Sequence, residues 1–475
     1  MILSNHSIEK IVVSCAAGLF LGFAGSSPLA GQTPASVGPT AGSYQGSVPT
    51  GQASQQPMDL SLDDAIRRGL QNNLGIILSG TQTASVRGQK LTELQNLLPA
   101  VQANGREVVS QVNLPAQGLR FPGFPDTIGP FGYIDIRASL NWSAVDLNAI
   151  RNYLAAKHNF AGAKLSAQDA REMVILTVGN AYLLVLAEQA RASSVEAQVA
   201  TAKVSLDQAE ANHEAGTAPM LDALRARVDY QSLQQQLIVT NNAIEKDKLA
   251  LARTIGLPVA QSFNLTDKAP YEAFDNMDVD ALVKQAEENR KDLAAMVEQT
   301  EAAQEQRKAA TASRLPVVSA ETDYGLIGPT LGQSHGTVNA TGTVTIPVFK
   351  EYSLRGQAEQ AQAQLDVAQA QLSDKKAQIE ADVRDALLDI AAAQKQVEVA
   401  RSSVDLASEV LNQAQQRYAN GVSDNLAVSE AQQTVARAND QLVASLYRHN
   451  VAKLNLARAL GAADDYRKYL GQAQP

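Results

Sequence analysis

The chain has 475 residues and a mass of 50.5 kDa. Hydrophobic residues make up 45% of it but aromatic residues only 5%, so alanine supplies much of the apolar content, which suits thin helix-on-helix packing. Lys and Arg number 40 against 49 Asp and Glu, a formal net charge of -9, and this acidic balance without a basic stripe argues against a nucleic-acid partner.

The N-terminal residues 1–30 are predicted to be a secretory signal peptide. Lys10 precedes the apolar run from Ile11 to Phe23, and small residues follow between Ala24 and Ala30. The only cysteine, Cys15, sits in a loose lipoprotein-like box, but the apolar region lies mostly after it, which argues against lipidation. Signal removal would leave no cysteine and therefore no disulfide or thiol chemistry.

A duplication organises the rest of the chain. The segment Leu249–Gly256 recurs as Leu454–Gly461, and the pair Leu98-Pro99 recurs as Leu315-Pro316. One loop in the first copy is longer, which changes the spacing between copies. The predicted organisation is a flexible leader at 31–58, a first repeat at 59–257, a linker at 258–276, a second repeat at 277–461 and a tail at 462–475.

Each repeat is predicted to open with one helix of about 35 residues. Ser61 and Asp278 are candidate N-caps, because their side chains can accept hydrogen bonds from free backbone amides. The helices are expected to stop at Pro99 and Pro316, since proline disfavours the helical conformation of the residue before it.

Two strands are predicted next in each repeat, at about 100–112 and 133–143, and at about 317–328 and 336–347. Polar and apolar residues alternate along the second strand of each pair, so each has one polar and one apolar face. The polar face of the last strand comprises Thr337, Asn339, Thr341, Thr343 and Thr345. The apolar positions of the two strands include Ile134, Ile136, Leu140, Trp142, Val344 and Ile346.

A very long helix is predicted to follow each strand pair, at about 146–213 and 350–418, because both stretches lack proline and are rich in Ala and Gln. Nearly 70 residues at 1.5 Å per residue is about 100 Å. Apolar residues at spacings of three, four and seven predict a coiled-coil seam. A solvent-exposed fibrous coil is an alternative, but it leaves the strands unexplained.

The strands are near the length that crosses a hydrocarbon layer when tilted. Four strands cannot close a barrel, and open edges in lipid would leave backbone groups unpaired at several kcal/mol each. Several chains must therefore contribute, and three would give twelve strands. The polar face would line a water-filled lumen, and helices of about 100 Å must project into an aqueous compartment.

The chain resembles the TolC family of outer-membrane efflux proteins in five features. These are the duplication, the Leu-Pro before each first strand, the strand exit at 345–349, the turn at 417–421 and the double Leu-x-Leu-Ala-Arg-x-x-Gly ending. The resemblance implies a mostly α fold with a β-barrel part. It implies a homotrimer with a 12-stranded outer-membrane barrel, continued by a periplasmic α-helical coiled-coil barrel, with the 258–276 linker in its equatorial region. It also implies a periplasmic adaptor protein and an inner-membrane transporter as partners, besides outer-membrane lipid.

Under this resemblance, function lies at the turns between the long helices. The adaptor-contact tips would be Gly216, Thr217, Gly421, Val422 and Ser423. The periplasmic gate would comprise Asp222, Tyr418 and Glu430. Ser423 stands where the best-known members carry a gate arginine, and Ala427 replaces the first of two acidic lumen positions, so the gate is expected to be lightly latched.

No enzyme is predicted, and no catalytic, cofactor or metal site. The segment Gly332–Gly336 matches G-x-S-x-G, but a strand rather than a helix follows it. The five histidines lack ligand spacing, and no P-loop is present, so ATP-driven work would belong to a partner. The sequence predicts a passive outer-membrane duct of a tripartite efflux or type I secretion system. The alternatives are a periplasmic coiled-coil adaptor without a barrel and a secreted hydrolase using Ser334.

Overall fold

The computed structural model describes residues 41–54, 56–267, 271–274, 278–420, 422–423 and 425–470. The predicted signal peptide at 1–30 lies outside these residues, as do Gly421 and the first part of the leader. Residues 39–475 form one unit, and only this unit is described below.

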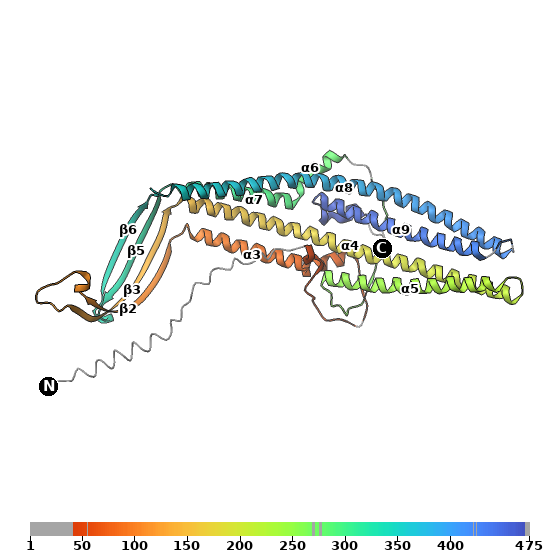
Figure 1. The fold of residues 1–475 in the computed structure, drawn as a ribbon, viewed down its shortest axis with the longest axis horizontal. Coiled ribbons are helices and arrows are strands. Elements are labelled where there is room, and N and C mark those ends of the chain that lie inside the picture. Colours follow the sequence, from red (N-terminus) through yellow and green to blue (C-terminus); the bar gives the residue numbers. More distant parts are fainter. Residues whose placement is uncertain are drawn as a thin grey trace, which may run out of the picture. The chain divides into compact units, whose positions relative to one another are not determined.

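The two repeats fold into the same series of elements (Figure 1). The first contains α2 (Leu62–Asn72), α3 (Leu74–Gln95), β2 (Ala100–Asn113), β3 (Thr127–Val145), α4 (Leu147–Glu214) and α5 (Met220–Ile255). The second contains α6 (Val279–Asn289), α7 (Lys291–Ala312), β5 (Val317–Gly328), β6 (His335–Thr345), α8 (Glu351–Ala419) and α9 (Asn425–Ala459). Two short strands, β1 (Met58–Leu60) and β4 (Phe263–Leu265), pair in parallel, and α10 (Tyr466–Leu470) follows α9.

The single opening helix predicted for each repeat is wrong, because each is broken in two. Asn73 and Arg290 adopt extended backbone between the two helices, with ψ of 135° and 122°. The Asn73 side chain accepts a hydrogen bond from the amide of Gly75 at 2.8 Å and caps the new helix. The break comes from tertiary contacts that local helix signals do not contain.

The repeated Leu-x-Leu-Ala-Arg-x-x-Gly ending packs against these breaks. Gly256 and Gly461 end α5 and α9 in the left-handed region, with φ of +78° and +66°. A Cβ on Gly256 would lie 2.4 Å from Cβ of Asn72, and one on Gly461 would lie 2.9 Å from the amide nitrogen of Arg290. Glycine is therefore required twice over, by conformation and by close approach.

The four long strands form one antiparallel sheet in the order β2-β3-β5-β6. Strand β3 begins at Thr127, earlier than the predicted start near Tyr133. It continues to Val145 with a register shift between Ser143 and Val145, whereas β6 ends at Thr345, before Pro347. The two repeats therefore leave the sheet differently.

The long helices form one wall in two parts. Next to the sheet, α3 packs on α4, α4 on α7, and α7 on α8. Farther along, α5 packs on α4, α4 on α9, and α9 on α8, ending in two helical hairpins (Figure 1). By length and composition, one helix among the described residues, α4, could cross a membrane, but its 68 residues run through this wall.

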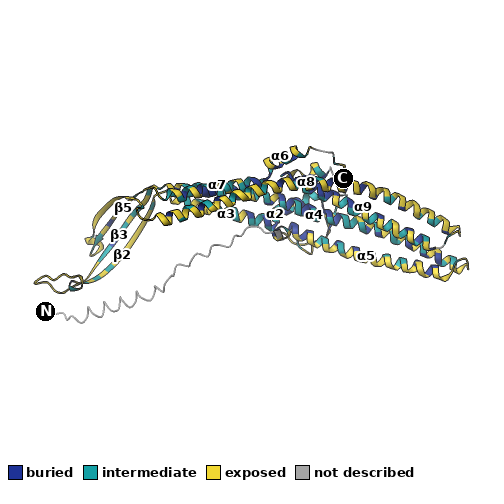
Figure 2. Cartoon of the chain, turned by 45° about the horizontal axis from the view of Figure 1, so that its top comes forward, coloured by how far each residue is buried: buried dark blue, intermediate teal, exposed yellow. Residues whose placement is uncertain are grey.

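Two apolar cores lie where the helix breaks meet the wall. The first joins α2, α4, α5, α9 and α10 with β1 and β4 around Tyr182, Leu251 and Leu454. The second joins α6, α8 and α9 around Ile379, Val383 and Leu456. Figure 2 shows the buried positions gathered there, while the strands are mostly exposed. These cores fix where the strands and the hairpins start.

Candidate functional site

The polar face of the sheet extends across all four strands. The register sets Arg106 opposite Asp135, and Asp323 opposite Ser139 on β3 and Asn339 on β6. Thr337, Thr341, Thr343 and Thr345 of β6 continue this face beside Gly325, Glu321, Ser319 and Val317. The predicted polar positions of β6 thus share a face with the polar residues of the first repeat.

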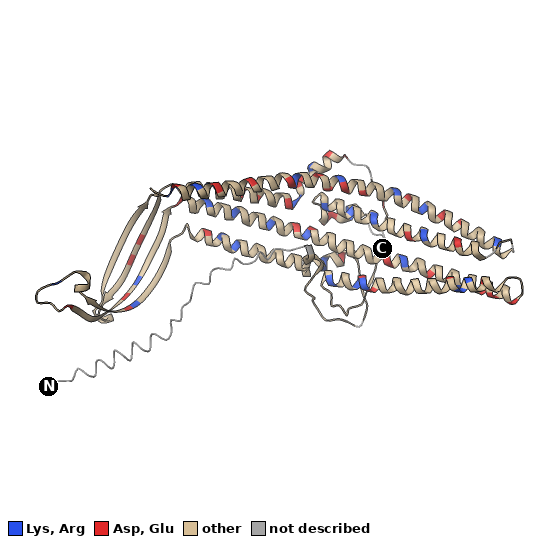
Figure 3. Cartoon of the chain, in the orientation of Figure 1, with Lys and Arg blue, Asp and Glu red and all other residues tan. Residues whose placement is uncertain are grey.

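An ion-pair network that the sequence reasoning missed lies on this face. Arg106 binds the Asp135 carboxylate at 2.9 Å, and Arg137 bridges Asp135 at 2.8 Å and Asp323 at 2.7 Å. The Asp135 side chain is only 1% exposed, because the two guanidinium groups cover it. Figure 3 shows that charges are few on the strands compared with the helices. The pairing across strands depends on register, which periodicity alone does not give.

The opposite face is apolar. It carries Ile134, Ile136, Leu140 and Trp142 of β3, and the register adds Val344 of β6 to the same face. Val344 is 61% exposed and Trp142 is 41% exposed. Ile346 lies just after the end of β6 and is also exposed. Glu107 of β2 is a polar exception on this face.

The sheet has two open edges. Strand β2 pairs only with β3, and β6 pairs only with β5, within the described residues. An edge strand presents a row of unpaired N–H and C=O groups, which invites pairing with another chain. The apolar face makes an open edge costly in lipid.

The first hairpin tip is a compact turn. Gly216 has φ of +71°, and the backbone and hydroxyl of Thr217 both donate to the Asn212 carbonyl at 2.9 Å. Both residues are exposed.

At the second tip, Val422 is exposed, its amide donates to the Arg417 carbonyl at 2.9 Å, and Ser423 is half-buried. The predicted tip residue Gly421 lies outside the described residues. The described tip residues therefore lie at the ends of the two hairpins, as the spacing of the turns implied.

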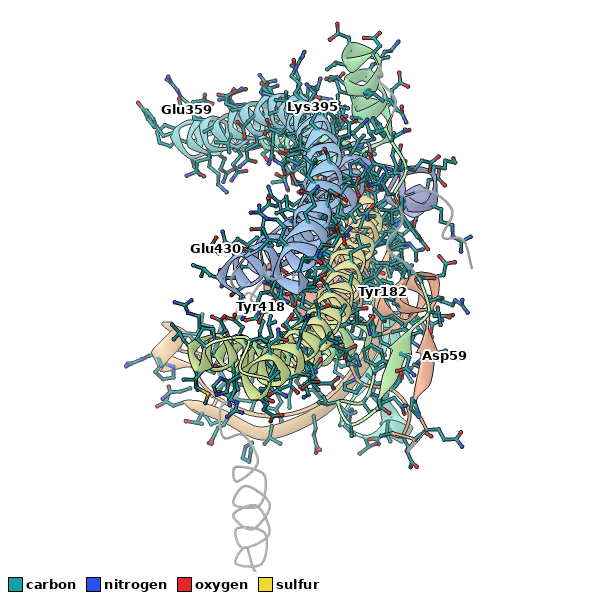
Figure 4. All side chains as sticks on the ribbon, turned by 90° about the vertical axis from the view of Figure 1, so that its right-hand side faces the viewer. Asp59, Tyr182, Glu359, Lys395, Tyr418 and Glu430 are labelled. Atoms are coloured by element: carbon teal, nitrogen blue, oxygen red, sulfur yellow. The ribbon has the colours of Figure 1, made fainter. Side chains whose placement is uncertain are left out.

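The proposed gate residues are not joined within one chain. Asp222 and Tyr418 are both buried, but the Tyr418 hydroxyl has no hydrogen-bond partner among the described residues. The Asn425 amide donates instead to the main-chain carbonyl of Asp222 at 3.3 Å. Glu430 is exposed and lies on the concave side of the curved helical wall, away from Tyr182 and Asp59 (Figure 4).

A cavity of about 540 Å³ lies between the hairpins, and the sequence did not reveal it. Its walls come from α4, α5, α8 and α9 and carry many hydroxyl and amide groups. They include Ser194, Gln198, Thr201, Asp229, Gln432 and Asn439. The Ser429 hydroxyl donates to the Asp229 carboxylate at 2.5 Å across it.

A buried charge cluster links four helices at the breaks. Arg290 is 5% exposed and binds Asp292 and Asp382, each at 2.7 Å. Burial raises the pKa of Asp292, but hydrogen bonds from Arg290 outweigh it and hold that pKa well below its usual range. Within the described residues, no group of three or more His, Cys, Asp or Glu side chains could hold a metal ion.

Arg458 joins this cluster from α9. It binds Asp169, and it binds Glu172 of α4 at 3.1 Å. Burial raises the pKa of Glu172 to about 7, and Arg458 opposes that rise. The cluster therefore ties α4 to the end of α9.

A family model described as "Outer membrane efflux protein" matches residues 282–462, which covers nearly all of the second repeat. Over these residues the chain is similar to this family. Its duplication extends the same series of elements over the first repeat. The sequence-based resemblance to outer-membrane efflux proteins is thereby confirmed.

Curated relatives and solved structures agree with the family. The chain is 23% identical over 425 residues to the toluene efflux pump outer membrane protein TtgC of Pseudomonas putida, covering 87% of this chain and 85% of that one. The antibiotic efflux pump outer membrane protein ArpC of the same species matches equally. The fold matches VceC of Vibrio cholerae with a TM-score of 0.74 at 21% identity, over 84% of this chain and 96% of that chain.

A second structural likeness is to the CmeC channel of Campylobacter jejuni, with a TM-score of 0.75 at 17% identity, over 86% of this chain and 89% of that one. The chain is mostly helical and has the fold of these outer-membrane channels. The prediction of an outer-membrane efflux channel is confirmed at the level of the family, which is a family of transport channels rather than enzymes. The alternative of an adaptor without a barrel is not favoured.

Proposed function

We propose that three copies of this outer membrane efflux protein close into one passive duct, a 12-stranded barrel in the outer membrane continued by a tube of helices in the periplasm. The family supplies the location and the transport role. The number of copies and the closure of the barrel are the proposal.

The main support for this proposal is that both the sheet and the helical wall have two unpaired sides. Strands β2 and β6 are the two edges of the sheet. In the helical wall, α3 and then α5 form one side, while α8, with α6 packed on its middle part, forms the other. Such unlike, complementary sides are those of a heterologous interface, which generates a ring when its rotation closes.

The two faces of the sheet also fit a barrel wall that crosses a membrane. The apolar face of β3 from Gly132, opposite Val109 of β2, to Trp142 is about 33 Å long at about 3.3 Å per residue, or about 25 Å high when tilted by roughly 40°. That is close to the roughly 25 Å apolar band of outer-membrane barrels. The apolar face would meet lipid and the polar face would line the lumen.

The hairpins supply the partner contacts in this proposal. Their tips at Gly216, Thr217, Val422 and Ser423, with Gly421, would receive a periplasmic adaptor, which would join the duct to an inner-membrane transporter. Asp222, Tyr418 and Glu430 would form the gate. Since relatives are named for toluene and antibiotic efflux, small toxic molecules are the proposed cargo.

Planar-bilayer recording tests this function. The purified protein, extracted in detergent, should insert and give discrete, long-lived conductance steps. A matched sample of the Val344→Asp variant, which puts a charge on the lipid face, should insert far less often. Absence of discrete steps from a folded, detergent-soluble preparation would contradict a duct.

A further inference from the structure

The linker between the two repeats crosses the second repeat at its residues 271–274, called the strap below. The amide of Phe274 donates to the side chain of Gln394 on α8 at 3.4 Å, and the Phe274 ring packs against the second apolar core. At the other end of the strap, the guanidinium carbon of Arg401 on α8 lies 4.0 Å from the centre of the Tyr271 ring. The strap therefore lies along the part of α8 where the second hairpin leaves its core.

Two basic side chains of α9 hold the strap through a single atom. The Lys453 ammonium group donates to the main-chain carbonyl of Glu272 at 2.6 Å. The Nε2 nitrogen of His449 donates to the same carbonyl at 3.1 Å. The ring of Tyr271 lies beside the His449 ring, with 5.3 Å between their centres. The strap thus bridges α8 and α9.

Both basic side chains are buried. His449 is 0% exposed and Lys453 is 1% exposed. Nδ1 of His449 has no hydrogen-bond partner among the described residues, and neither side chain forms an ion pair with them. Buried charges are normally paired with an opposite charge. Two positive charges on one buried carbonyl would be strongly unfavourable, so the docked strap requires a neutral His449.

The charged groups around this pair do not relieve that conflict. Lys453 acts on His449 from the same helix, the linker contributes the Glu272 carboxylate, which favours the charged form of Lys453, and α8 contributes Arg401 across the Tyr271 ring. Burial lowers the pKa of His449 below 6.5, and the charge of Lys453 lowers that pKa further. The released strap therefore binds the proton more tightly than the docked strap. Docking is fully stable above pH 6.5 and weakens as the pH falls below it.

We propose that the strap is an acid-released clamp on the base of the second hairpin. Protonation of His449 sets a second positive charge beside Lys453, and the strap leaves so that both side chains reach water. Release removes the bridge between α8 and α9, which frees the base of the hairpin. A histidine suits this role because its charge changes in the physiological pH range. The inference concerns the fold of one chain and does not depend on the proposed ring.

Proteolysis at the strap tests the clamp. A glutamyl endopeptidase that works in both mild acid and weak base cuts after glutamate, and the carbonyl of Glu272 is the group that α9 holds. The full chain in detergent is digested at pH 7.5 and pH 5.0, and cleavage after Glu272 is followed by mass spectrometry. Each rate is divided by the rate on a short unstructured peptide at the same pH. The normalised rate should rise at least fivefold at pH 5.0.

Three variants identify the group responsible. His449→Gln keeps a donor for the carbonyl but takes up no proton, so its normalised rate should stay low at both pH values. Lys453→Gln also keeps a donor but removes the neighbouring charge, so the rise in acid should be smaller than in the unmodified chain. His158→Gln is the matched control, because His158 contacts Glu298 far from the strap, and its rate should rise as in the unmodified chain.

Every outcome bears on the clamp. An unmodified chain whose rate does not rise in acid, or a His449→Gln variant whose rate rises equally, overturns it. Rapid cleavage of His449→Gln at both pH values would mean that this variant loses the strap, and Lys453→Gln then decides. In that case a smaller rise supports the clamp and an equal rise overturns it. Loss of the helical circular dichroism of the unmodified chain at pH 5.0 would show global unfolding and would also overturn a local release.

Discussion

At the scale of single residues, the Tyr418 hydroxyl needs a hydrogen-bond partner that the described residues of one chain do not supply. Its hydroxyl is buried at the end of α8 without a partner among the described residues. Leaving a buried hydroxyl unpaired costs about 1–3 kcal/mol. In the closed assembly, we expect a neighbouring hairpin to supply the acceptor, with Asp222 as the candidate.

Removing both groups should therefore loosen the mouth. The double variant Asp222→Ala with Tyr418→Phe is expected to raise single-channel conductance, because it removes the proposed polar link between hairpins. Tyr230→Phe, which deletes a hydroxyl farther along α5, should not change it. Conductance equal to that of the unmodified channel would count against this pair as the latch.

Glu172 predicts a pH dependence of stability. Its pKa rises from 4.5 to about 7 because it is buried, so the folded chain binds its proton more tightly than the unfolded chain does. The associated stability is fully present below pH 4.5 and is lost as the pH rises through 7.

Glu172→Gln should therefore increase the free energy of unfolding at pH 8 by roughly 1–3 kcal/mol, which raises the unfolding temperature. At pH 4 it should change the unfolding temperature little. The exposed Glu196→Gln on the same helix is the control. Thermal circular dichroism at both pH values measures this. An equal effect of Glu172→Gln at pH 4 and pH 8 would refute the assignment.

At the scale of elements, two turn glycines of the first repeat distinguish the cost of backbone strain from the cost of steric overlap. Gly216 and Gly256 both have positive φ, but only at Gly256 would a Cβ meet neighbours. Gly216→Ala should cost about 1–2 kcal/mol from conformation alone. Gly256→Ala should cost clearly more, since it also forces Asn72 away from the helix break. Unfolding temperatures of the two variants in one detergent decide this, and equal losses would contradict it.

The two faces of β6 make a matched pair for mutagenesis. Val344→Asp places a charge on the apolar face and should sharply reduce the amount of assembled protein in the outer membrane. Thr343→Asp, one residue away on the polar face, should be tolerated. Quantification of heat-resistant oligomers in membrane fractions measures both. Equal loss from the two variants would mean that the faces are wrongly assigned.

The strand faces could be predicted from the sequence, but the breaks in the opening helices could not. Period-two alternation was enough to separate Thr343 from Val344, because side-chain direction in a strand is set locally. The breaks at Asn73 and Arg290 were not predictable, since they depend on Gly256 and Gly461 approaching from far along the chain.

The site was predictable only in part. Turn spacing located the hairpin tips. The Arg137 bridge between Asp135 and Asp323 and the Arg290 cluster needed the register and the tertiary packing. The gate residues came from resemblance alone and remain predictions.

At the scale of the whole molecule, the described unit is incomplete. It has an apolar strand face, two unpaired sheet edges and solvent-exposed leucines on α5 and α8. Each of these features destabilises an isolated chain in lipid or water, and each would be covered by placing another copy alongside. On the proposed function, the duct would form only in the assembly, and the single chain would be one part of its wall.

Multi-angle light scattering of the detergent-solubilised protein, with the detergent mass subtracted, measures the number of chains in the particle. The account predicts a protein mass close to three times that of the mature chain, independent of concentration over the measured range. A stable particle containing one chain would contradict it.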